Sequence, residues 1–355
     1  MNLLDINLYK EDIKKVSQLN LSWNMLNNKS ILITGATGMI GSFLIDLLMY
    51  MNKSNNLNCN IHAISRNINV AKKRFEPYWE SNLFNYYESD INQQVSLNVD
   101  KIDIVIHAAS NTHPIAYATK PIDTIITNII GTRNLLEFAS NKNVEKFIFI
   151  STVEIYGENR RDTDKFSENY CGYIDCNTLR AGYPESKRAG EALCQAYIKE
   201  KGLNIVIPRL SRVFGPTMLM TDTKAISQFI INAVENKNIV LKSNGEQLYS
   251  YSYVADAVIG ILLCIFKGEN GEAYNISSDN YDIRLKDLAT IIAKSLEKEV
   301  IFDIPTSTEA EGYSKATKAT IDNSKLKSLG MNSLYTINES IERTIKILKQ
   351  LYRGE

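Results

Sequence analysis

Tyr183 and Lys187 form a Tyr-x-x-x-Lys pair within residues 181–191. Four-residue spacing on a helix places both side chains on one face, about one turn apart. A free tyrosine has a pKa of about 10 and is a poor base at neutral pH. A nearby ammonium group favours the phenolate, and so would the positive ring of an oxidised nicotinamide. The pair therefore predicts a general base for a hydroxyl group, although an isolated copy also fits a surface helix with a solvated lysine.

Alternating strands and helices surround this pair. The chain has 355 residues, of which 44% are hydrophobic, enough for a sizeable core. We predict an α/β fold: a Rossmann-like doubly wound parallel sheet with a smaller mixed α/β C-terminal substrate lobe. The predicted strands cover residues 30–34, 61–64, 102–107, 146–151 and 204–208, and the predicted helices cover 39–51, 121–140 and 183–201. The expected units are an N-terminal helical extension (1–28), a dinucleotide-binding domain with the catalytic helix (29–210) and a mainly substrate-binding lobe (211–355), parts of which return to the first domain.

The composition excludes several classes of partner. Forty basic residues balance 40 acidic ones, so no overall field attracts nucleic acid or a membrane surface. No N-terminal stretch resembles a signal peptide, and no apolar run approaches 18 residues. Five scattered cysteines and three histidines indicate no metal site. We expect a soluble cytoplasmic protein that binds neither nucleic acid nor membrane.

Three glycines at Gly-x-x-Gly-x-x-Gly spacing follow the first predicted strand and open a helix. Such glycines permit a tight turn, and the helix N-terminus presents amide groups to a pyrophosphate. We expect a dinucleotide there, bound by Gly35, Thr37, Gly38, Met39, Ile40 and Gly41. The second strand ends in Ser65 and Arg66, where NAD-binding chains have a carboxylate. An arginine meets a 2′-phosphate, so NADP is mildly favoured over NAD, unless Arg66 is only an exposed surface residue.

With these motifs, residues 29–350 resemble the extended short-chain dehydrogenase/reductase family of nucleotide-sugar epimerases and dehydratases. The resemblance rests on residues 107–110, 128–132, 208–216 and 322–330. It implies a catalytic triad of Thr152, Tyr183 and Lys187, a nucleotide-diphosphate sugar as substrate and a homodimer formed through two helices. It implies further cofactor contacts from Asp90, Ile91, Ala108, Ala109, Ser110, Asn128, Ser151 and Arg209, together with Tyr183 and Lys187. The expected substrate-binding residues are Ser110, Thr112, Thr152, Val153, Glu154, Arg212, Lys242 and Tyr249.

Within that family the pattern is most similar to the UDP-glucuronate decarboxylases, with three departures. Val153 replaces a serine between Thr152 and Glu154, Tyr249 replaces an arginine that meets the substrate carboxylate, and Arg212 replaces an asparagine. An unpaired carboxylate is costly to bury, so we expect a pocket without that arginine not to select a uronic acid. The 4,6-dehydratase pattern also has an acid where this chain has Val153. Glu154 is either a catalytic base or a structural carboxylate.

The resemblance and the residues together predict an NAD(P)-dependent enzyme that oxidises a sugar hydroxyl, at carbon 4, to a keto intermediate. Epimerisation or 4,6-dehydration is the expected outcome. The alternatives are a 4-keto reductase or dehydrogenase, a decarboxylase disfavoured by Tyr249 and Val153, and a non-catalytic dinucleotide-binding protein. A reductase of small carbonyl compounds is disfavoured because the C-terminal loops resemble sugar-nucleotide-binding loops.

Overall fold

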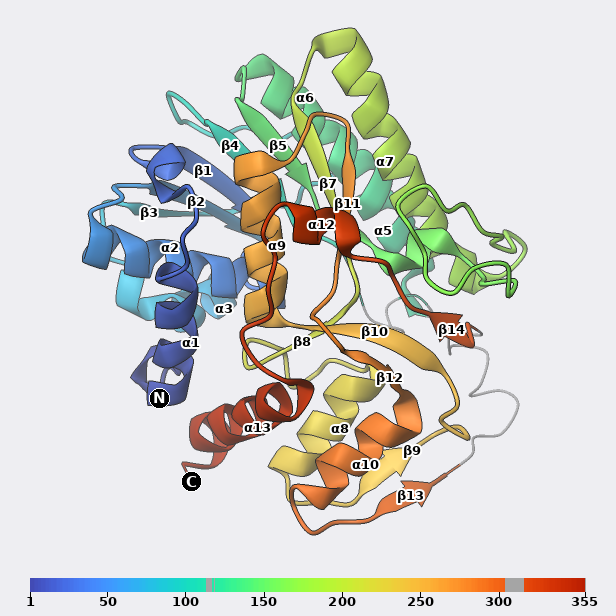
Figure 1. The fold of residues 1–355 in the computed structure, drawn as a ribbon. Helices are drawn as coiled ribbons and strands as arrows, with labels where there is room; N and C mark the ends of the chain where they lie inside the picture. Colours follow the sequence, from blue (N-terminus) through green and yellow to red (C-terminus); the bar gives the residue numbers. More distant parts are fainter. Residues whose placement is uncertain (113–116, 118, 304–315, 355) are drawn as a thin grey trace.

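A parallel sheet forms the centre of the larger part of the molecule in the computed structural model, which describes residues 1–112, 117, 119–303 and 316–354 (Figure 1). Its strands are β1 (Ser30–Thr34), β2 (Asn60–Ser65), β3 (Phe84–Glu88), β4 (Ile104–His107), β5 (Lys146–Phe149), β7 (Ile205–Leu210) and β11 (Ala273–Ile276), and β6 (Ser151–Thr152) extends β5 along β7. The strand order is β11-β7-β5-β4-β1-β2-β3, and every pairing is parallel. The order reverses between β1 and β4, so the predicted doubly wound sheet is confirmed.

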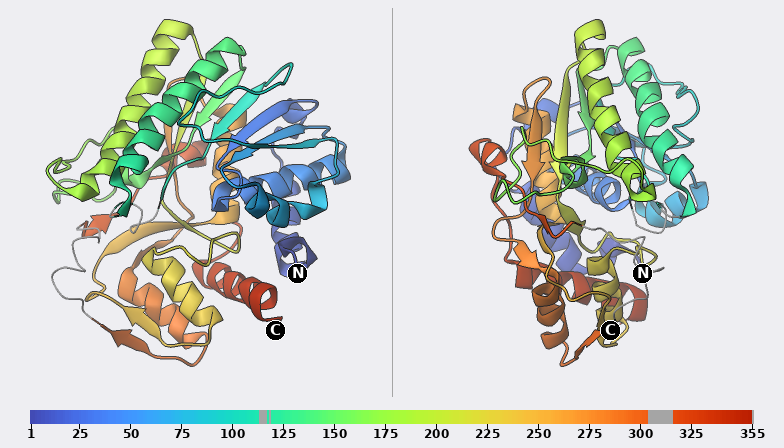
Figure 2. Two further views of the ribbon diagram at one scale, coloured as in Figure 1. Left: turned by 180° about the vertical axis from the view of Figure 1, so that it is seen from behind. Right: turned by 90° about the vertical axis from the view of Figure 1, so that its right-hand side faces the viewer.

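Helices cover both faces of this sheet, and each face has its own apolar core (Figure 2). One face carries α5 (Pro121–Ile126), a π-helical turn (Thr127–Gly131), α6 (Thr132–Asn141) and α7 (Gly182–Lys201). The other face carries α2 (Met39–Asn55), α3 (Ile68–Arg74) and α9 (Val254–Lys267). Because side chains on both faces are covered, strands such as β4 are buried throughout and apolar except for His107 at the end.

The smaller lobe lies below the carboxyl ends of the parallel strands in Figure 1. Its strands are β8 (Arg212–Phe214), β9 (Ile239–Leu241), β10 (Leu248–Tyr253), β12 (Asp282–Arg284), β13 (Val300–Phe302) and β14 (Lys318–Ala319). Its helices are α8 (Ala225–Val234), α10 (Leu285–Lys294) and α13 (Ile337–Arg353). β10 is flanked by β12 and β14 and also pairs with β8, whereas β9 pairs only with β13. Three elements from the same half of the chain, α9, β11 and α12 (Ser324–Ser328), belong instead to the part built around the large sheet.

The N-terminal extension connects the two parts. Helix α1 (Asn7–Ser17) packs against α2, α9 and α13. Its buried Asp12 accepts hydrogen bonds from Tyr253 Oη at 2.5 Å, Tyr335 Oη at 2.7 Å and Arg343 Nε at 2.9 Å. One turn earlier, Tyr9 Oη donates to Asp46 Oδ2 of α2 at 2.5 Å. The extension is therefore an integral part of the junction between the lobes.

Among the described residues, none of the helices is both long enough and apolar enough to cross a membrane.

We predict that Asp12→Ala lowers the free energy of unfolding by about 3 kcal/mol, because it leaves the buried phenol of Tyr253 without its acceptor and removes a partner of the half-buried Tyr335 and Arg343. Urea denaturation at pH 7 measures this change. Glu11→Ala is the matched control, since Glu11 also contacts Arg343, at 3.2 Å, but its side chain is 55% exposed. The control should change stability by less than about 1 kcal/mol. Equal effects of the two substitutions would contradict the assigned role of Asp12.

Candidate active site

The predicted dinucleotide end of the site lies where β1 gives way to α2. Gly35 has a φ of +67°, and a Cβ there would lie 2.7 Å from Ala108 O and 2.8 Å from Ala109 N. Only glycine tolerates this approach of the turn to the end of β4. Helix α2 begins at Met39, and no side chain caps its N-terminus. Its first-turn amides are therefore available to an anion such as a pyrophosphate.

The smaller lobe reaches this same turn. Thr217 Oγ1 donates to Met39 O at 2.9 Å, just after the predicted loop 214–216. Thr37, Gly38 and Ile40 are half-buried beside it, while Gly41 is buried against the turn, since a Cβ there would lie 2.5 Å from Gly35 O. The structure thus assembles all six residues of the predicted glycine motif into one cradle at the edge of the sheet.

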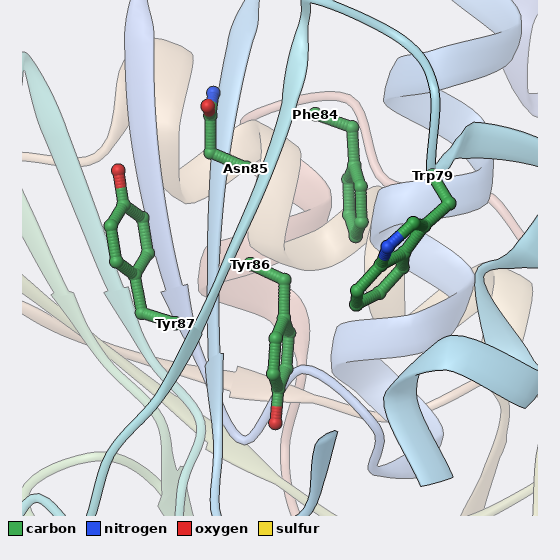
Figure 3. Close-up of a pocket in the computed structure, with 5 residues that line it drawn as sticks. All are labelled: Trp79, Phe84, Asn85, Tyr86 and Tyr87. Carbon is green, nitrogen blue, oxygen red and sulfur yellow. The ribbon is translucent and has the colours of Figure 1, made fainter. Parts of the chain in front are cut away.

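The carboxyl end of β2 carries Ser65 and Arg66. Ser65 Oγ lies 3.0 Å from Tyr86 Oη, and the same hydroxyl of Tyr86 donates to Ser65 O at 2.9 Å. Figure 3 shows Tyr86 beside Trp79 in a hollow of about 270 Å³ on the edge strand β3, with Tyr87 directed to the opposite side. Arg66 is exposed. Ser65 is thus held by a tyrosine, whereas Arg66 projects into solvent at the position where an adenosine ribose is expected.

A chain of hydrogen bonds connects the end of β4 to the catalytic helix. Ser110 Oγ donates to Asn128 Oδ1 at 2.7 Å, Asn128 Nδ2 donates to Ser186 Oγ at 2.9 Å, and Ser186 Oγ donates to Tyr183 O at 2.9 Å. Asn128 lies in the π-helical turn between α5 and α6, and such turns often occur at functional sites. Sequence periodicity predicted one continuous helix here and missed the turn.

The other predicted cofactor contacts lie around this chain. Ala108, Ala109 and Ser110 are half-buried after β4. Ile91 is buried under the π-helical turn, where a Cβ on Gly131 would lie 2.7 Å from its Cδ1, and Asp90 is exposed next to it. Both therefore lie at the carboxyl edge of the sheet, near Asn128.

Tyr183 lies in the first turn of α7 and is buried. Burial raises its pKa above the ordinary value of 10, the charge of Glu154 raises it further, and hydrogen bonds from Thr152 and Tyr117 oppose these effects. The ring of Tyr117 stacks on the ring of Tyr183 with their centroids 4.7 Å apart. The tyrosine and threonine of the expected triad are therefore brought together, but the phenol remains protonated at neutral pH in the protein alone. We expect Lys187 to make it acidic only together with a nicotinamide ring, and this stays a prediction, since the pKa of Tyr183 lies above its ordinary value in the protein alone.

Lys187 is buried one turn further along α7. Its Nζ donates to Ile150 O at 2.9 Å and lies 4.8 Å from the centroid of the Phe149 ring. Burial lowers the pKa of Lys187 to about 8, although the carboxylate of Glu191 acts in the opposite direction. At pH 7 the side chain of Lys187 is therefore still charged. The pKa of the buried His107 is lowered mainly by its own burial and further by the charge of Lys187.

Two further predicted cofactor residues, Ser151 and Arg209, are held by Glu191. Ser151 Oγ donates to Glu191 Oε1 at 2.5 Å. Arg209 forms a bidentate ion pair with Glu191, with distances of 3.0 Å and 2.6 Å, and also donates to Tyr156 Oη and Glu168 O. Arg209 and Lys187 thus both interact with Glu191 in this structure.

Glu154 forms an ion pair with Arg180, whose Nη2 lies 2.6 Å from Glu154 Oε2. The guanidinium of Arg180 also lies over the ring of Tyr117, 4.8 Å from its centroid. Its Nε and Nη1 are buried without hydrogen-bond partners. Sequence reasoning missed both Arg180 and Tyr117. The position of Arg180, three residues before Tyr183 at the start of the helix, was the available signal.

The predicted substrate residues divide into two groups. Thr152 and Glu154 lie beside Tyr183, while Ser110 reaches the same helix through Asn128. Val153, between them in the sequence, is only 4% exposed and belongs to the apolar core. In the smaller lobe, Arg212 lies 3.5 Å above the ring centroid of Tyr249, while Lys242 and Thr112 are exposed.

These residues fit a nicotinamide dinucleotide. The uncapped start of α2 suits its pyrophosphate, and Asn128 is hydrogen-bonded to Ser186 on α7, the helix that carries Tyr183 and Lys187. Figure 2 shows α7 running from this carboxyl edge along one face of the sheet.

We predict that Lys187→Met increases the free energy of unfolding at pH 7 by up to about 3 kcal/mol, because it removes a buried charge whose pKa is lowered from 10.5 to about 8. The folded state releases the lysine proton near pH 8 and the unfolded state near pH 10.5. The gain over the parent protein should therefore shrink as pH rises through this window. Urea denaturation at pH 7 and pH 10.5 checks this, and a gain independent of pH would contradict the burial of the ammonium.

Comparison with known proteins agrees with this geometry. Residues 31–277 match the model of the NAD dependent epimerase/dehydratase family. UDP-glucuronic acid decarboxylase 1 of Xenopus tropicalis is 33% identical over 66% of this chain, and the match spans 53% of that protein, about half its length. UDP-glucuronic acid decarboxylase 6 of Arabidopsis thaliana is 30% identical over 77% of this chain and 76% of its own length.

Solved structures have the same architecture. A UDP-glucuronic acid 4-epimerase from Bacillus cereus, in complex with UDP-glucuronic acid and NAD, is 25% identical with a TM-score of 0.77, covering 91% of this chain and all of that one. A dTDP-glucose 4,6-dehydratase from Streptomyces venezuelae, with NAD bound, is 21% identical with a TM-score of 0.77 over 92% of this chain and 98% of that one, a likeness of fold. With its Gly-rich turn, doubly wound sheet and Thr-Tyr-Lys cluster, the chain belongs to the NAD-dependent epimerase/dehydratase family, the nucleotide-sugar-modifying branch of the extended short-chain dehydrogenases/reductases.

Proposed function

We propose that this protein is a nucleotide-sugar 4-epimerase that oxidises the hydroxyl group at carbon 4 of the sugar to a ketone and then reduces it from the other side. The observation that carries this proposal is the cluster in which Thr152 lies beside the buried Tyr183, while Lys187 is buried one turn away on the same helix. The nucleotide sugars named for the relatives and the solved structures support a nucleotide-diphosphate sugar as the substrate.

Each residue of the cluster has a defined task. Tyr183 removes the proton of the reacting hydroxyl, and Thr152 hydrogen-bonds the same oxygen and positions it. Lys187 supplies positive charge that opposes the burial of the phenolate, as long as it stays protonated, below about pH 8. The nicotinamide, when bound, supplies a hydride acceptor and donor, together with the positive charge that the ligand-free cluster lacks.

The position of Val153 favours epimerisation over 4,6-dehydration. Loss of a hydroxyl group as water needs an acid to protonate it, and Val153 stands where the dehydratases have that acid. Its side chain is buried in the apolar core and carries no proton to donate. Loss of general-acid assistance typically costs about 10²–10⁴-fold in rate. Glu154, the remaining acidic residue of the motif, is already paired with Arg180.

The residues at the end of β2 bear on the choice between NAD and NADP. Structural neighbours contain NAD. We infer a mild preference of this chain for NADP, since Arg66 is exposed at the end of β2 and Ser65 offers no carboxylate to ribose hydroxyls. Titration of the purified protein with NAD and with NADP, followed by calorimetry, compares the two affinities directly.

We also propose a homodimer that pairs α5 and α7 with the same helices of a second copy. Ile122 and Ile126 stand one turn apart on α5 and are 73% and 39% exposed, and Leu179, just before α7, is 71% exposed. The α6 residues Leu135 and Leu136, by contrast, are fully buried in the core of the sheet face and are not available to a partner. Helices α5 and α7 pack against each other, and apolar side chains this exposed on neighbouring elements suit an interface with a second copy.

We predict that Tyr183→Phe lowers kcat at least about 10²-fold, because it removes the proton acceptor while keeping the ring and its stacking with Tyr117. Turnover is measured with a panel of UDP- and dTDP-sugars by product mass and sugar resonances, and binding by calorimetry. The expected product has unchanged mass and inverted configuration at carbon 4. Near-normal turnover by the variant would contradict the role of Tyr183 as the base. A product lighter than the substrate by one water would show that the reaction is dehydration and not epimerisation.

A second prediction concerns Glu154. Hydride return to the same carbon keeps the original hydrogen on the ring, so the epimer formed in deuterium oxide should contain no carbon-bound deuterium. Glu154→Gln should retain turnover within about 10-fold of the parent, because the carboxylate acts as the partner of Arg180. Arg180→Gln is the matched test of the same pair, and the double variant should be no worse than the poorer single variant. Deuterium uptake that disappears in Glu154→Gln would instead establish Glu154 as a base.

A further inference from the structure

One arginine of the smaller lobe has an unusual setting. Arg212 lies in β8, and its guanidinium carbon is 3.5 Å from the centroid of the Tyr249 ring on β10. Parallel pairing of the two strands places Tyr251 beside Arg212. Tyr249 is fixed in turn, since its hydroxyl donates to Ala316 O at 2.7 Å. A tyrosine platform thus holds the guanidinium in one place.

This guanidinium has no anionic partner in the described part of the chain. No carboxylate within 4.0 Å forms an ion pair with Arg212 there, and its Nη1 is buried without a hydrogen-bond partner. The other arginines around the catalytic helix are compensated: Arg180 by Glu154 and Arg209 by Glu191. Burying an unsatisfied charged donor is costly. An anion brought by a ligand would satisfy it.

Arg212 is close to the reacting centre along the chain. Leu210, at the end of β7, is the register partner of Thr152. Arg212 follows two residues later, within about 7 Å of extended backbone. The path leads out of the large sheet at its carboxyl edge, where β8 pairs with β10 and enters the smaller lobe. A sugar held at Thr152 and Tyr183 therefore lies within reach of a long arginine side chain.

Two of the three departures from the decarboxylase pattern, at positions 212 and 249, lie next to each other in the structure. The decarboxylase pattern has an asparagine at position 212 and an arginine at position 249, whereas this chain has arginine at 212 and tyrosine at 249. The structure places the new arginine directly over the new tyrosine. The cation has moved from β10 to the neighbouring strand β8, and the premise that this part of the pocket lacks an arginine does not hold.

We propose that Arg212, supported by Tyr249, binds a carboxylate on the sugar ring, so that the preferred substrate is a nucleotide-hexuronic acid. The inference rests on the proposed action on a nucleotide sugar and specifies its substrate class. A guanidinium offers two parallel N–H groups that match the two oxygens of a carboxylate. The competing assignment, a contact with the diphosphate, uses the same chemistry but predicts equal importance for charged and neutral sugars.

Binding distinguishes the two without any turnover. Affinities for UDP-glucuronate, UDP-glucose and UDP are measured by calorimetry on the dinucleotide-loaded protein, for the parent and for Arg212→Gln. We expect the parent to bind UDP-glucuronate more tightly than UDP-glucose. Arg212→Gln should weaken UDP-glucuronate by about 10- to 100-fold, and UDP-glucose and UDP by less than about 3-fold.

Control variants separate the guanidinium from general effects. Arg284→Gln removes the same charge from a side chain that is 54% exposed and paired with Glu246, and it should leave all three affinities unchanged. Tyr249→Phe keeps the platform and should keep the selectivity, whereas Tyr249→Ala should reduce it. Thermal unfolding of each variant verifies that it is folded, and Arg212→Lys, which keeps the charge without the fork, replaces Arg212→Gln if that variant does not fold.

Three outcomes would overturn the assignment. An equal loss for UDP-glucuronate and UDP-glucose would make Arg212 a diphosphate ligand, and no loss for either would make it a structural residue. A parent protein that does not favour UDP-glucuronate would exclude a uronate subsite. Because these measurements record binding alone, they stand even if Tyr183→Phe keeps its activity, the result that would refute the proposed catalytic function.

Discussion

The burial of one ammonium group constrains the whole catalytic region. Lys187 lies against the Phe149 ring and donates to Ile150 O, and its pKa is lowered to about 8 by loss of water. An uncompensated charge at this depth would be neutralised by proton loss. Glu191, one turn along α7, opposes this, and it is itself compensated by Arg209. Lys187, Glu191 and Arg209 therefore form a series of alternating charges, and this arrangement keeps the lysine protonated near neutral pH.

This arrangement explains why the phenol is not acidic in the protein alone. The lysine is directed at a backbone carbonyl behind the site, whereas Tyr183 is surrounded by Tyr117, Thr152 and the charge of Glu154. Burial and a nearby carboxylate both disfavour the phenolate, and two hydrogen bonds do not outweigh them. Activation must then depend on the occupied site, where a cationic ring adds to the lysine. The base would be strong only when the oxidant for the same carbon is present.

The sequence predicted the sheet well because its signals are local. Apolar runs bounded by glycine and polar residues predicted β1 at its observed bounds, 30–34, and located both ends of β2, β4, β5 and β7 to within two residues. The π-helical turn at Asn128 was missed, since it keeps an apolar pattern and breaks only the hydrogen-bond register. Arg180 and Tyr117 were missed for a different reason. Their roles arise from contacts between segments far apart in the chain, which no spacing rule encodes.

Arg212 shows the same limit most clearly. In the sequence, Tyr249 stands where the decarboxylase pattern has the arginine that meets a carboxylate. The arginine gained at position 212 lies 37 positions earlier, and nothing in the sequence relates the two changes. Pairing of β8 with β10 brings the two positions together, and the guanidinium of Arg212 lies over the ring of Tyr249. Two substitutions that look like separate losses along the chain can therefore form one contact in space, which only the strand pairing reveals.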